Sequence, residues 1–346
     1  MAFGINTFDK MKNTSEFQDK VVVVTGASGG LGRVVAREFG KQGAKVVLLA
    51  RGAEGLAGAK REVEATGAEA LTIVTDVSDA EQVEAAAVKA EETFGSIDVW
   101  VNNAMNSVFA PMKNIAPAEF KRVIDVTLMG QVYGTMSALK RMLPRDKGTI
   151  ILIGSALAYR GIPLQSAYCS AKHGIQGFFD SLRSELIHDD SKIKLTMIEL
   201  PAMNTTQFGW VKSRLPNKPK PMGKVYEPEV AARAVIFAAS AGHKRRTIWV
   251  GFPTFESIIG NKIWPAYLDH YLARTGYKGQ QTNEPVDPDR KNNLWEPVPE
   301  DRGAYGGFEK VATNRSSLLW ISMHRQAAVV ATVLFVLLML LVLALC

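Results

Sequence analysis

Short runs of β-branched and apolar residues alternate with longer helical stretches, and this alternation constrains the fold more than any other feature of the chain. Such a pattern is typical of βαβ units, in which helices connect parallel strands. Most strand candidates are continuously apolar, as expected for strands buried under helices on both faces. We therefore predict an α/β fold with one doubly wound, parallel, seven-stranded sheet, whose strands are Val21–Thr25, Lys45–Ala50, Ala70–Val74, Val99–Asn102, Thr149–Gly154, Lys194–Glu199 and Thr247–Val250.

The intervening helices are expected on both faces of this sheet. They are predicted at Leu31–Gln42, Glu54–Thr66, Asp79–Thr93, Pro117–Met142, Ser166–His188 and Glu227–Ala241. Beyond Thr275 the chain becomes rich in proline and glycine and loses its periodicity, which indicates a linker. We expect Trp295 and Tyr305 to lay part of it on the domain surface. The predicted organisation is an N-terminal extension (1–19), a domain (20–275), a linker (276–320) and a C-terminal segment (326–346).

The C-terminal segment contains 19 residues without a charge, from Ala327 to Leu345. At about 1.5 Å per residue a helix of this length crosses a hydrocarbon core of about 30 Å, so we predict a transmembrane helix at 326–346. Arg315, His324 and Arg325 precede the run, and the N-terminus has no signal peptide pattern. The positive-inside rule then predicts a single-pass C-terminal membrane anchor with the folded domain on the cytoplasmic side.

Composition narrows the function classes. The chain has 346 residues, 47% of them hydrophobic, which excludes a disordered or fibrous protein. Its two cysteines and five scattered histidines match no disulfide scaffold or metal-ligand spacing, so no metal site is expected. The net charge of +7 and the cluster His243–Arg246 raise nucleic-acid binding as a possibility. The cluster is short and has no stacking aromatics beside it, so we predict no nucleic-acid partner.

A glycine-rich turn follows the first predicted strand and leads into a helix, in the sequence Thr25-Gly26-Ala27-Ser28-Gly29-Gly30-Leu31-Gly32. A dinucleotide diphosphate requires backbone amides and a helix N-terminus at close range, and glycines permit both the approach and the turn. This context predicts a Rossmann-type dinucleotide site.

The spacing of this turn resembles the glycine motif of the short-chain dehydrogenase/reductase family. Four further motifs follow in that family's order: Asp76-Val77, Asn102-Asn103-Ala104, Ser155, and Tyr168 to Lys172. The resemblance covers roughly residues 20–251, implies a nicotinamide cofactor and leaves a homodimer open. The cofactor-binding residues that it implies are Gly26, Ser28, Gly30, Leu31, Gly32, Arg51, Asp76, Val77, Asn103, Ala104, Tyr168, Lys172 and Pro201.

Arg51 ends the second predicted strand, where an acidic residue would bind the ribose 2′-hydroxyl of NAD. An arginine can instead pair with the 2′-phosphate of NADP. NADP (NADPH) is therefore the preferred cofactor, with NAD left open.

Tyr168 and Lys172 are four residues apart, so a helix places them on the same face. A phenol is a poor acid or base near neutral pH unless its anion is stabilised, and the Lys172 ammonium can do that. The resemblance implies that Ser155 binds the substrate carbonyl, Tyr168 transfers the proton and Lys172 also holds the cofactor ribose.

Three positions depart from the family pattern. Thr127 occupies the place of the family's fourth catalytic residue, an asparagine, Met105 replaces a glycine, and Ala202 replaces the glycine after Pro201. The leading prediction is an NADP-dependent enzyme that interconverts a carbonyl and an alcohol, with a lipophilic small-molecule substrate. The alternative is a catalytically weak NADP-binding sensor or scaffold at a membrane.

Overall fold

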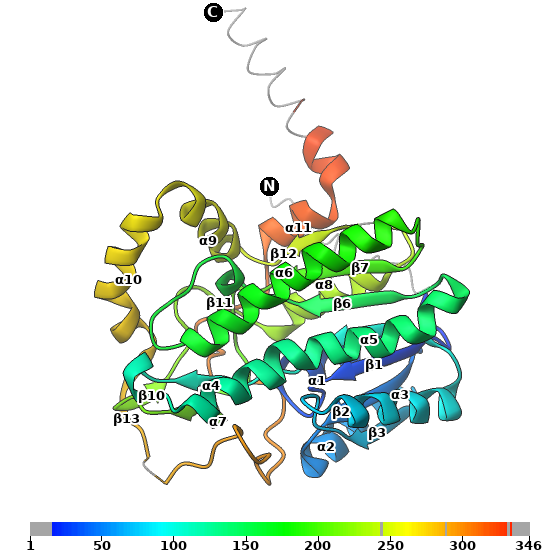
Figure 1. The fold of residues 1–346 in the computed structure, drawn as a ribbon, viewed down its shortest axis with the longest axis horizontal. Helices are drawn as coiled ribbons and strands as arrows, with labels where there is room; N and C mark the ends of the chain where they lie inside the picture. Colours follow the sequence, from blue (N-terminus) through cyan, green and yellow to red (C-terminus); the bar gives the residue numbers. More distant parts are fainter. Residues whose placement is uncertain (1–15, 243–244, 288, 331–332, 334–346) are drawn as a thin grey trace, which may run out of the picture.

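The computed structural model describes residues 16–242, 245–287, 289–330 and 333, and its centre is a seven-stranded parallel sheet (Figure 1). The strand order is β3-β2-β1-β4-β6-β7-β12, so the chain starts at the middle of the sheet and winds to one edge and then to the other. The strands are β1 (Val21–Thr25), β2 (Lys45–Ala50), β3 (Ala70–Val74), β4 (Ile97–Asn102), β6 (Thr149–Ile153), β7 (Lys194–Glu199) and β12 (Thr247–Trp249). These are the predicted strands, in the predicted Rossmann-like sheet.

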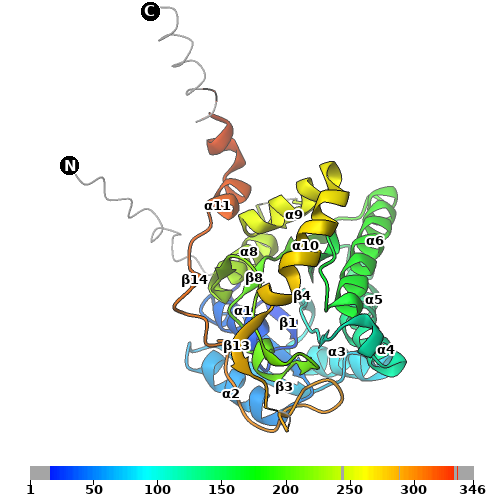
Figure 2. The same cartoon turned by 90° about the vertical axis from the view of Figure 1, so that its left-hand side faces the viewer.

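Helices cover both faces of the sheet (Figure 2). Alternate residues of β1 show how the faces separate, because Val22 and Val24 pack into one buried cluster while Val21 and Val23 pack into the other. The first cluster includes α1 (Gly30–Gly40), α2 (Ala53–Glu64) and α8 (Pro228–Ala239), and the second includes α3 (Ala80–Phe94), α5 (Gly130–Met142) and α6 (Ser166–His188).

The predicted helix Pro117–Met142 is helical throughout but is divided by one wider turn. α4 (Pro117–Ile124) is followed by a π-helical turn (Asp125–Met129) and then by α5. Glycine lets α5 approach the sheet closely, since a Cβ on Gly134 would lie 2.1 Å from Asn102 Oδ1. Such wider turns are frequent at functional sites, and this one carries Thr127.

Smaller elements surround the carboxyl edge of the sheet. Three short parallel strands, β8 (Ala202–Met203), β11 (Val225–Tyr226) and β14 (Ala312–Thr313), form one small sheet. Two other strand pairs join β5 (Val108–Phe109) to β9 (Lys212–Ser213), and β10 (Asn217–Pro219) to β13 (Gln281–Pro285). The remaining helices are α7 (Gln207–Trp210), α9 (Phe252–Ile263), α10 (Pro265–Gly279) and α11 (Ser317–Met323).

The transmembrane helix predicted at 326–346 was the wrong part of the fold prediction. Within the described ranges, no helix is both long enough and apolar enough to cross a membrane. α11 ends where His324 leaves the helical conformation (φ −118°, ψ 44°), and only residues 325–330 continue as helix before the description is interrupted. The prediction rested on apolar composition, which does not by itself establish a continuous helix. Residues 331–332 and 334–346 of the predicted span lie outside the described residues.

The segment predicted as a linker lies along the domain. Its β13 and β14 pair with strands of the domain, and Leu294 and Ala304 are buried. Trp295 and Tyr305, which we expected to attach the segment, are 51% and 43% exposed. The burial therefore comes from their smaller neighbours, while Tyr305 attaches the segment through its hydroxyl, which accepts from Arg37 at 3.2 Å and donates to Glu229. The domain boundaries themselves stay a prediction.

Candidate active site

A cavity of about 470 Å³ opens at the carboxyl ends of the central strands, where ligands bind in α/β folds of this kind. The loops that follow six strands of the sheet contribute to its wall. The predicted site residues that line it are Gly26, Ser28, Gly30, Leu31, Arg51, Asp76, Val77, Asn103, Ala104, Ser155, Tyr168, Lys172 and Pro201. Gly32 and Thr127 are not among the lining residues.

The glycine turn has the backbone geometry that requires glycine at two positions. Gly26 has φ +67° and Gly30 has φ +55°, in the left-handed region that disfavours other residues. A Cβ on Gly26 would lie 2.8 Å from Ala104 Cα, so the turn packs directly on the loop after β4. Gly32 has a packing role, because its Cβ would lie 2.3 Å from the Gly26 carbonyl oxygen.

The Asn103-Ala104 turn is fastened to the end of β1. The backbone N–H groups of both residues donate to Thr25 Oγ1, at 2.9 and 3.0 Å. Asn103 Nδ2 donates to the Thr25 carbonyl oxygen at 2.9 Å. These bonds hold two walls of the cavity in a fixed relation before any ligand binds.

Asp76 lies beside the charged side chain of Arg122. Its carboxylate accepts hydrogen bonds from Arg122 and from the Ser78 N–H and hydroxyl. Burial alone would raise the pKa of Asp76, but these hydrogen bonds outweigh burial and lower it. The carboxylate that the family resemblance assigns to the adenine ring is thus ionised and held in one orientation.

The Arg51 guanidinium is held by main-chain carbonyls of the predicted linker. Nη1 donates to the Trp295 oxygen at 2.6 Å, and Nη2 donates to the Asn293 oxygen. Burial lowers the pKa of Arg51, and the Arg122 charge acts in the same direction against the opposing Asp76. Arginine stays protonated across the ordinary pH range, so a cation lies at the adenosine end of the cavity.

Tyr168 and Lys172 project from the first turns of α6. Lys172 is 1% exposed, and its Nζ donates to the Ile153 carbonyl oxygen at 2.5 Å and lies 5.6 Å from the Tyr168 ring centroid. Burial lowers the pKa of Lys172 to about 8, against the attraction of Glu199. Burial also raises the pKa of the Tyr168 phenol, which the Ser155 hydroxyl partly offsets. The phenol is therefore protonated at neutral pH and able to donate.

Ser155 is positioned by a buried carboxyl group. Its backbone N–H donates to Glu199 Oε2 at 2.7 Å, and its hydroxyl accepts from the Leu157 N–H at 3.1 Å, so the hydroxyl proton is directed to the Tyr168 phenol. Glu199 Oε1 accepts from the Tyr159 hydroxyl at 3.0 Å. Burial raises the pKa of Glu199 to about 7, although its hydrogen bonds and Lys172 act in the opposite direction.

Thr127 is buried beside the site and not in it. Its hydroxyl donates to the Asn106 carbonyl oxygen at 3.0 Å and accepts from the Asn106 N–H at 3.1 Å. One turn later, Gln131 Nε2 donates to the same Ile153 oxygen that Lys172 uses, at 3.0 Å. Gln131 Oε1 is buried without a hydrogen-bond partner among the described residues. An amide is therefore present near Lys172, but it comes from a different position.

Sequence reasoning missed three residues of this arrangement: Gln131, Glu199 and Thr206. Thr206 lines the cavity, and its buried hydroxyl has no partner within the described part of the chain. The signal available for it was the polar run Asn204-Thr205-Thr206, which begins five residues after the end of the sixth strand. Glu199 is an acid at the end of a buried strand, where an unpaired charge is costly, and this was also a usable signal.

The residues present fit a dinucleotide. The cradle around Gly26 and Gly30 leaves little room for side chains, α1 begins at Gly30, and Thr206, whose buried hydroxyl has no partner among the described residues, lines the same cavity. Amides at a helix N-terminus bind diphosphates, and Tyr168 and Lys172 line the same cavity. The fold and the cavity define the class of nicotinamide-dependent oxidoreductases.

The comparison with known proteins narrows this class. The family model described as short chain dehydrogenase matches residues 20–214, more than half of the chain. The chain belongs to the short-chain dehydrogenase/reductase family.

Three relatives show the range of the similarity. The uncharacterized oxidoreductase YxnA of Bacillus subtilis (strain 168) is 33% identical over 295 residues, which cover 85% of this chain and 82% of YxnA. Levodione reductase of Leifsonia aquatica is 40% identical over 47% of this chain and 62% of its own length. A crystal structure of a metagenomic short-chain oxidoreductase in complex with NADP has a TM-score of 0.58 and 28% identity, over 68% of this chain and 98% of that one.

Proposed function

We propose that the protein is an NADP(H)-dependent enzyme that interconverts a carbonyl and an alcohol. The observation that carries this proposal is that Ser155, Tyr168 and Lys172 line the same cavity as the glycine turn. A dinucleotide bound along the turn would place its nicotinamide toward these three residues, and it would supply or accept the hydride.

Each of the three residues has a separate role in this proposal. The Ser155 hydroxyl donates a hydrogen bond to the substrate oxygen and fixes its position. The Tyr168 phenol donates its proton to that oxygen in reduction and takes it back in oxidation. The Lys172 ammonium stabilises the phenolate left behind, since a positive charge lowers the free energy of a nearby anion. Its bond to the Ile153 oxygen holds it in the required orientation.

NADP is the proposed cofactor because of the charge at the adenosine end. Arg51 lines the cavity after β2, where an acid would favour NAD. The structural relative bound to NADP supports the same choice. Asp76 is paired with Arg122, so the acid nearest this position is already neutralised by a cation.

A lipophilic substrate is proposed from the apolar side chains in the cavity wall. Besides the predicted cofactor-binding residues, the cavity is lined by Phe109, Leu157, Ile162, Met203, Phe208, Met222 and Leu272, with Lys220 and Glu256 among its charged residues. Such a wall gains free energy of about 25 cal/mol for each Å² of apolar substrate surface that it buries.

A panel of aldehydes, ketones and alcohols, graded in apolar size, tests the proposal. NADPH or NADH consumption is followed by absorbance at equal protein concentration. We expect turnover with NADPH, with kcat/KM increasing with the apolar surface of the substrate. Absence of turnover on the whole panel by a protein that binds NADPH would favour the second candidate, a catalytically weak NADP-binding sensor or scaffold.

The specific observation that favours this second candidate is the environment of Thr127. Its hydroxyl is fully used by the Asn106 backbone, so it does not replace the family's asparagine. Gln131, however, brings an amide to the Ile153 oxygen beside Lys172. The intact Ser155, Tyr168 and Lys172 group makes the enzyme the better-supported proposal.

A further inference from the structure

A segment outside the family match lines part of the cofactor cavity. This segment, residues 290–308, lies between β13 and β14 and contains neither helix nor strand. We call this segment the strap. Leu294 is fully buried in it, and Ala304 is 3% exposed. The strap therefore packs on the domain as a part of its structure.

Main-chain carbonyls of the strap accept hydrogen bonds from residues in and around the cofactor cavity. Besides the two bonds from Arg51 to residues 293 and 295, Arg122 Nε donates to the Leu294 oxygen at 3.1 Å. Further along, the Gly30 N–H at the start of α1 donates to the Gly303 oxygen at 3.2 Å. The strap thus touches both the adenosine end of the cavity and the glycine turn.

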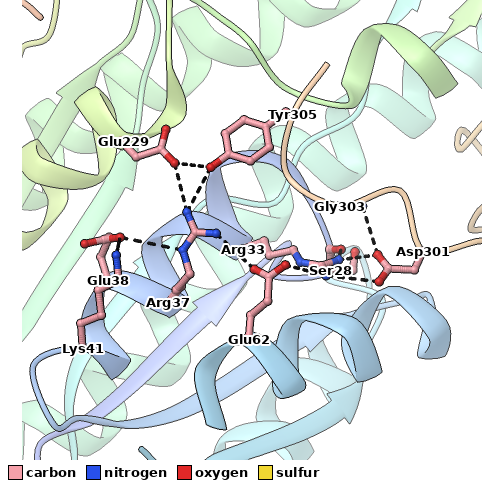
Figure 3. A network of polar contacts seen from close by, with 10 residues as sticks. All are labelled: Ser28, Arg33, Arg37, Glu38, Lys41, Glu62, Glu229, Asp301, Gly303 and Tyr305. Carbon is pink, nitrogen blue, oxygen red and sulfur yellow. Dashed lines mark hydrogen bonds and ion pairs between the residues drawn. The ribbon is translucent and has the colours of Figure 1, made fainter. Parts of the chain in front are cut away.

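An ion-pair network fastens the strap to α1 (Figure 3). Arg33, whose side chain is 5% exposed, donates to both carboxylate oxygens of Asp301 and also pairs with Glu62 at 2.9 Å. Asp301 in turn accepts from the Gly303 N–H at 3.0 Å, which sets the turn that faces Gly30. Because Arg33 is buried, this pair is less screened than a surface pair.

Strap side chains also line the cavity. Pro297, Val298, Glu300 and Arg302 contribute to the same wall as the glycine turn. Glu300 alone would repel a phosphate, but it is paired with Arg302 at 3.4 Å and with Lys291 at 3.7 Å. These three side chains carry one net positive charge. Arg302 precedes Gly303, whose carbonyl oxygen meets Gly30, and its guanidinium lies near α7, because a Cβ on Gly209 would be 3.9 Å from Arg302 Nη1. The next residue of α7, Trp210, approaches the glycine turn, since a Cβ on Gly29 would lie 2.8 Å from its ring. A diphosphate binds at the helix N-terminus that follows this turn.

We infer that the strap is a part of the cofactor site, in which Arg302 binds the dinucleotide diphosphate and the Arg33–Asp301 pair keeps the strap closed over it. The inference rests on the proposed function, since it assigns further residues to the same cofactor. The diphosphate is common to both dinucleotides, so Arg302 serves NADPH and NADH alike. Arg51, in contrast, faces a group that only NADPH carries.

The test is equilibrium binding and dissociation of NADPH and NADH, measured by nucleotide fluorescence on the full chain. Three variants are compared with the wild type: Arg302→Gln, Asp301→Asn and the control Lys310→Gln. Lys310 is an exposed cation beyond the strap and does not line the cavity. Asp301→Asn leaves Arg33 paired with Glu62, so no buried charge is abandoned. Thermal unfolding checks that each variant is folded.

We expect Arg302→Gln to raise the Kd of both dinucleotides by roughly tenfold, as for the loss of a charge-assisted hydrogen bond. Asp301→Asn should accelerate dissociation of both, and Lys310→Gln should match the wild type. Wild-type affinity and dissociation rate in both strap variants would overturn the inference while leaving the proposed function intact. A wild type that binds neither dinucleotide would overturn the proposed function and, with it, the inference.

Discussion

The buried carboxyl group of Glu199 leads to a prediction about the pH dependence of stability. Its oxygens accept hydrogen bonds from the Ser155 N–H and the Tyr159 hydroxyl, and the side chain is fully buried. Glutamine can replace both bonds, because its amide oxygen accepts from Ser155 and its NH₂ group donates to the Tyr159 oxygen. Glu199→Gln therefore removes the ionisable proton while keeping the hydrogen-bond geometry.

The size of the contribution of Glu199 to the free energy of unfolding follows from its pKa in the folded and unfolded states. Burial raises the pKa of Glu199 from 4.5 to about 7 in the folded protein. At about 1.4 kcal/mol per pH unit, this difference corresponds to about 3 kcal/mol. Because the folded state binds the proton more tightly, the contribution to stability is complete below pH 4.5 and is lost as the pH rises through about 7.

Urea unfolding of the wild type and of Glu199→Gln, followed by tryptophan fluorescence at several pH values from 4.5 to 8, measures this contribution. The free energies of unfolding should be nearly equal at pH 4.5, and at pH 8 the variant should be more stable by about 3 kcal/mol. The exposed acid Glu54 offers the control, since Glu54→Gln should follow the wild type at every pH. Parallel curves for the wild type and Glu199→Gln would refute the reasoning.

Two further predictions concern the cofactor and the proton donor's neighbours. Arg51→Gln should weaken NADPH binding by roughly tenfold or more and NADH binding by a clearly smaller factor, because only NADPH carries the 2′-phosphate, whereas both cofactors are affected by the lost bonds from Arg51 to the strap. An equal loss for both cofactors in fluorescence titration would contradict the assignment. Gln131→Leu should lower kcat by roughly tenfold with little change in KM, because it removes the amide that shares the Ile153 oxygen with Lys172. Steady-state kinetics with an unchanged kcat would show that Gln131 has only a packing role.

Much of the fold could be predicted because its signals are local. The apolar runs specify the buried strands, and the glycine turn specifies where α1 begins. Gly26 and Gly30 have positive φ angles, which glycine adopts more readily than other residues. This constraint acts within the turn itself, so the glycines mark the turn in the sequence. The positions of Tyr168 and Lys172 on one helix face likewise follow from helical spacing alone.

The parts that could not be predicted depend on contacts between distant residues. Arg51 meets the carbonyl oxygens of residues about 240 positions later, and no local pattern announces such a contact. The proline- and glycine-rich composition of the strap indicates a lack of regular structure, but it does not show whether the segment packs. Gln131 follows the π-helical turn at 125–129, which changes the phase of the helix and which the sequence pattern did not indicate.

The central claim is that Tyr168 transfers the proton in a reaction between a carbonyl and an alcohol. Single-turnover measurement of NADPH oxidation by Tyr168→Phe, on whichever carbonyl the wild type reduces, tests it most directly. We predict that the variant binds NADPH as the wild type does and reduces the substrate two to four orders of magnitude more slowly, an increase of about 3 to 5 kcal/mol in the barrier. A variant that binds NADPH and retains most of the wild-type rate would contradict the claim.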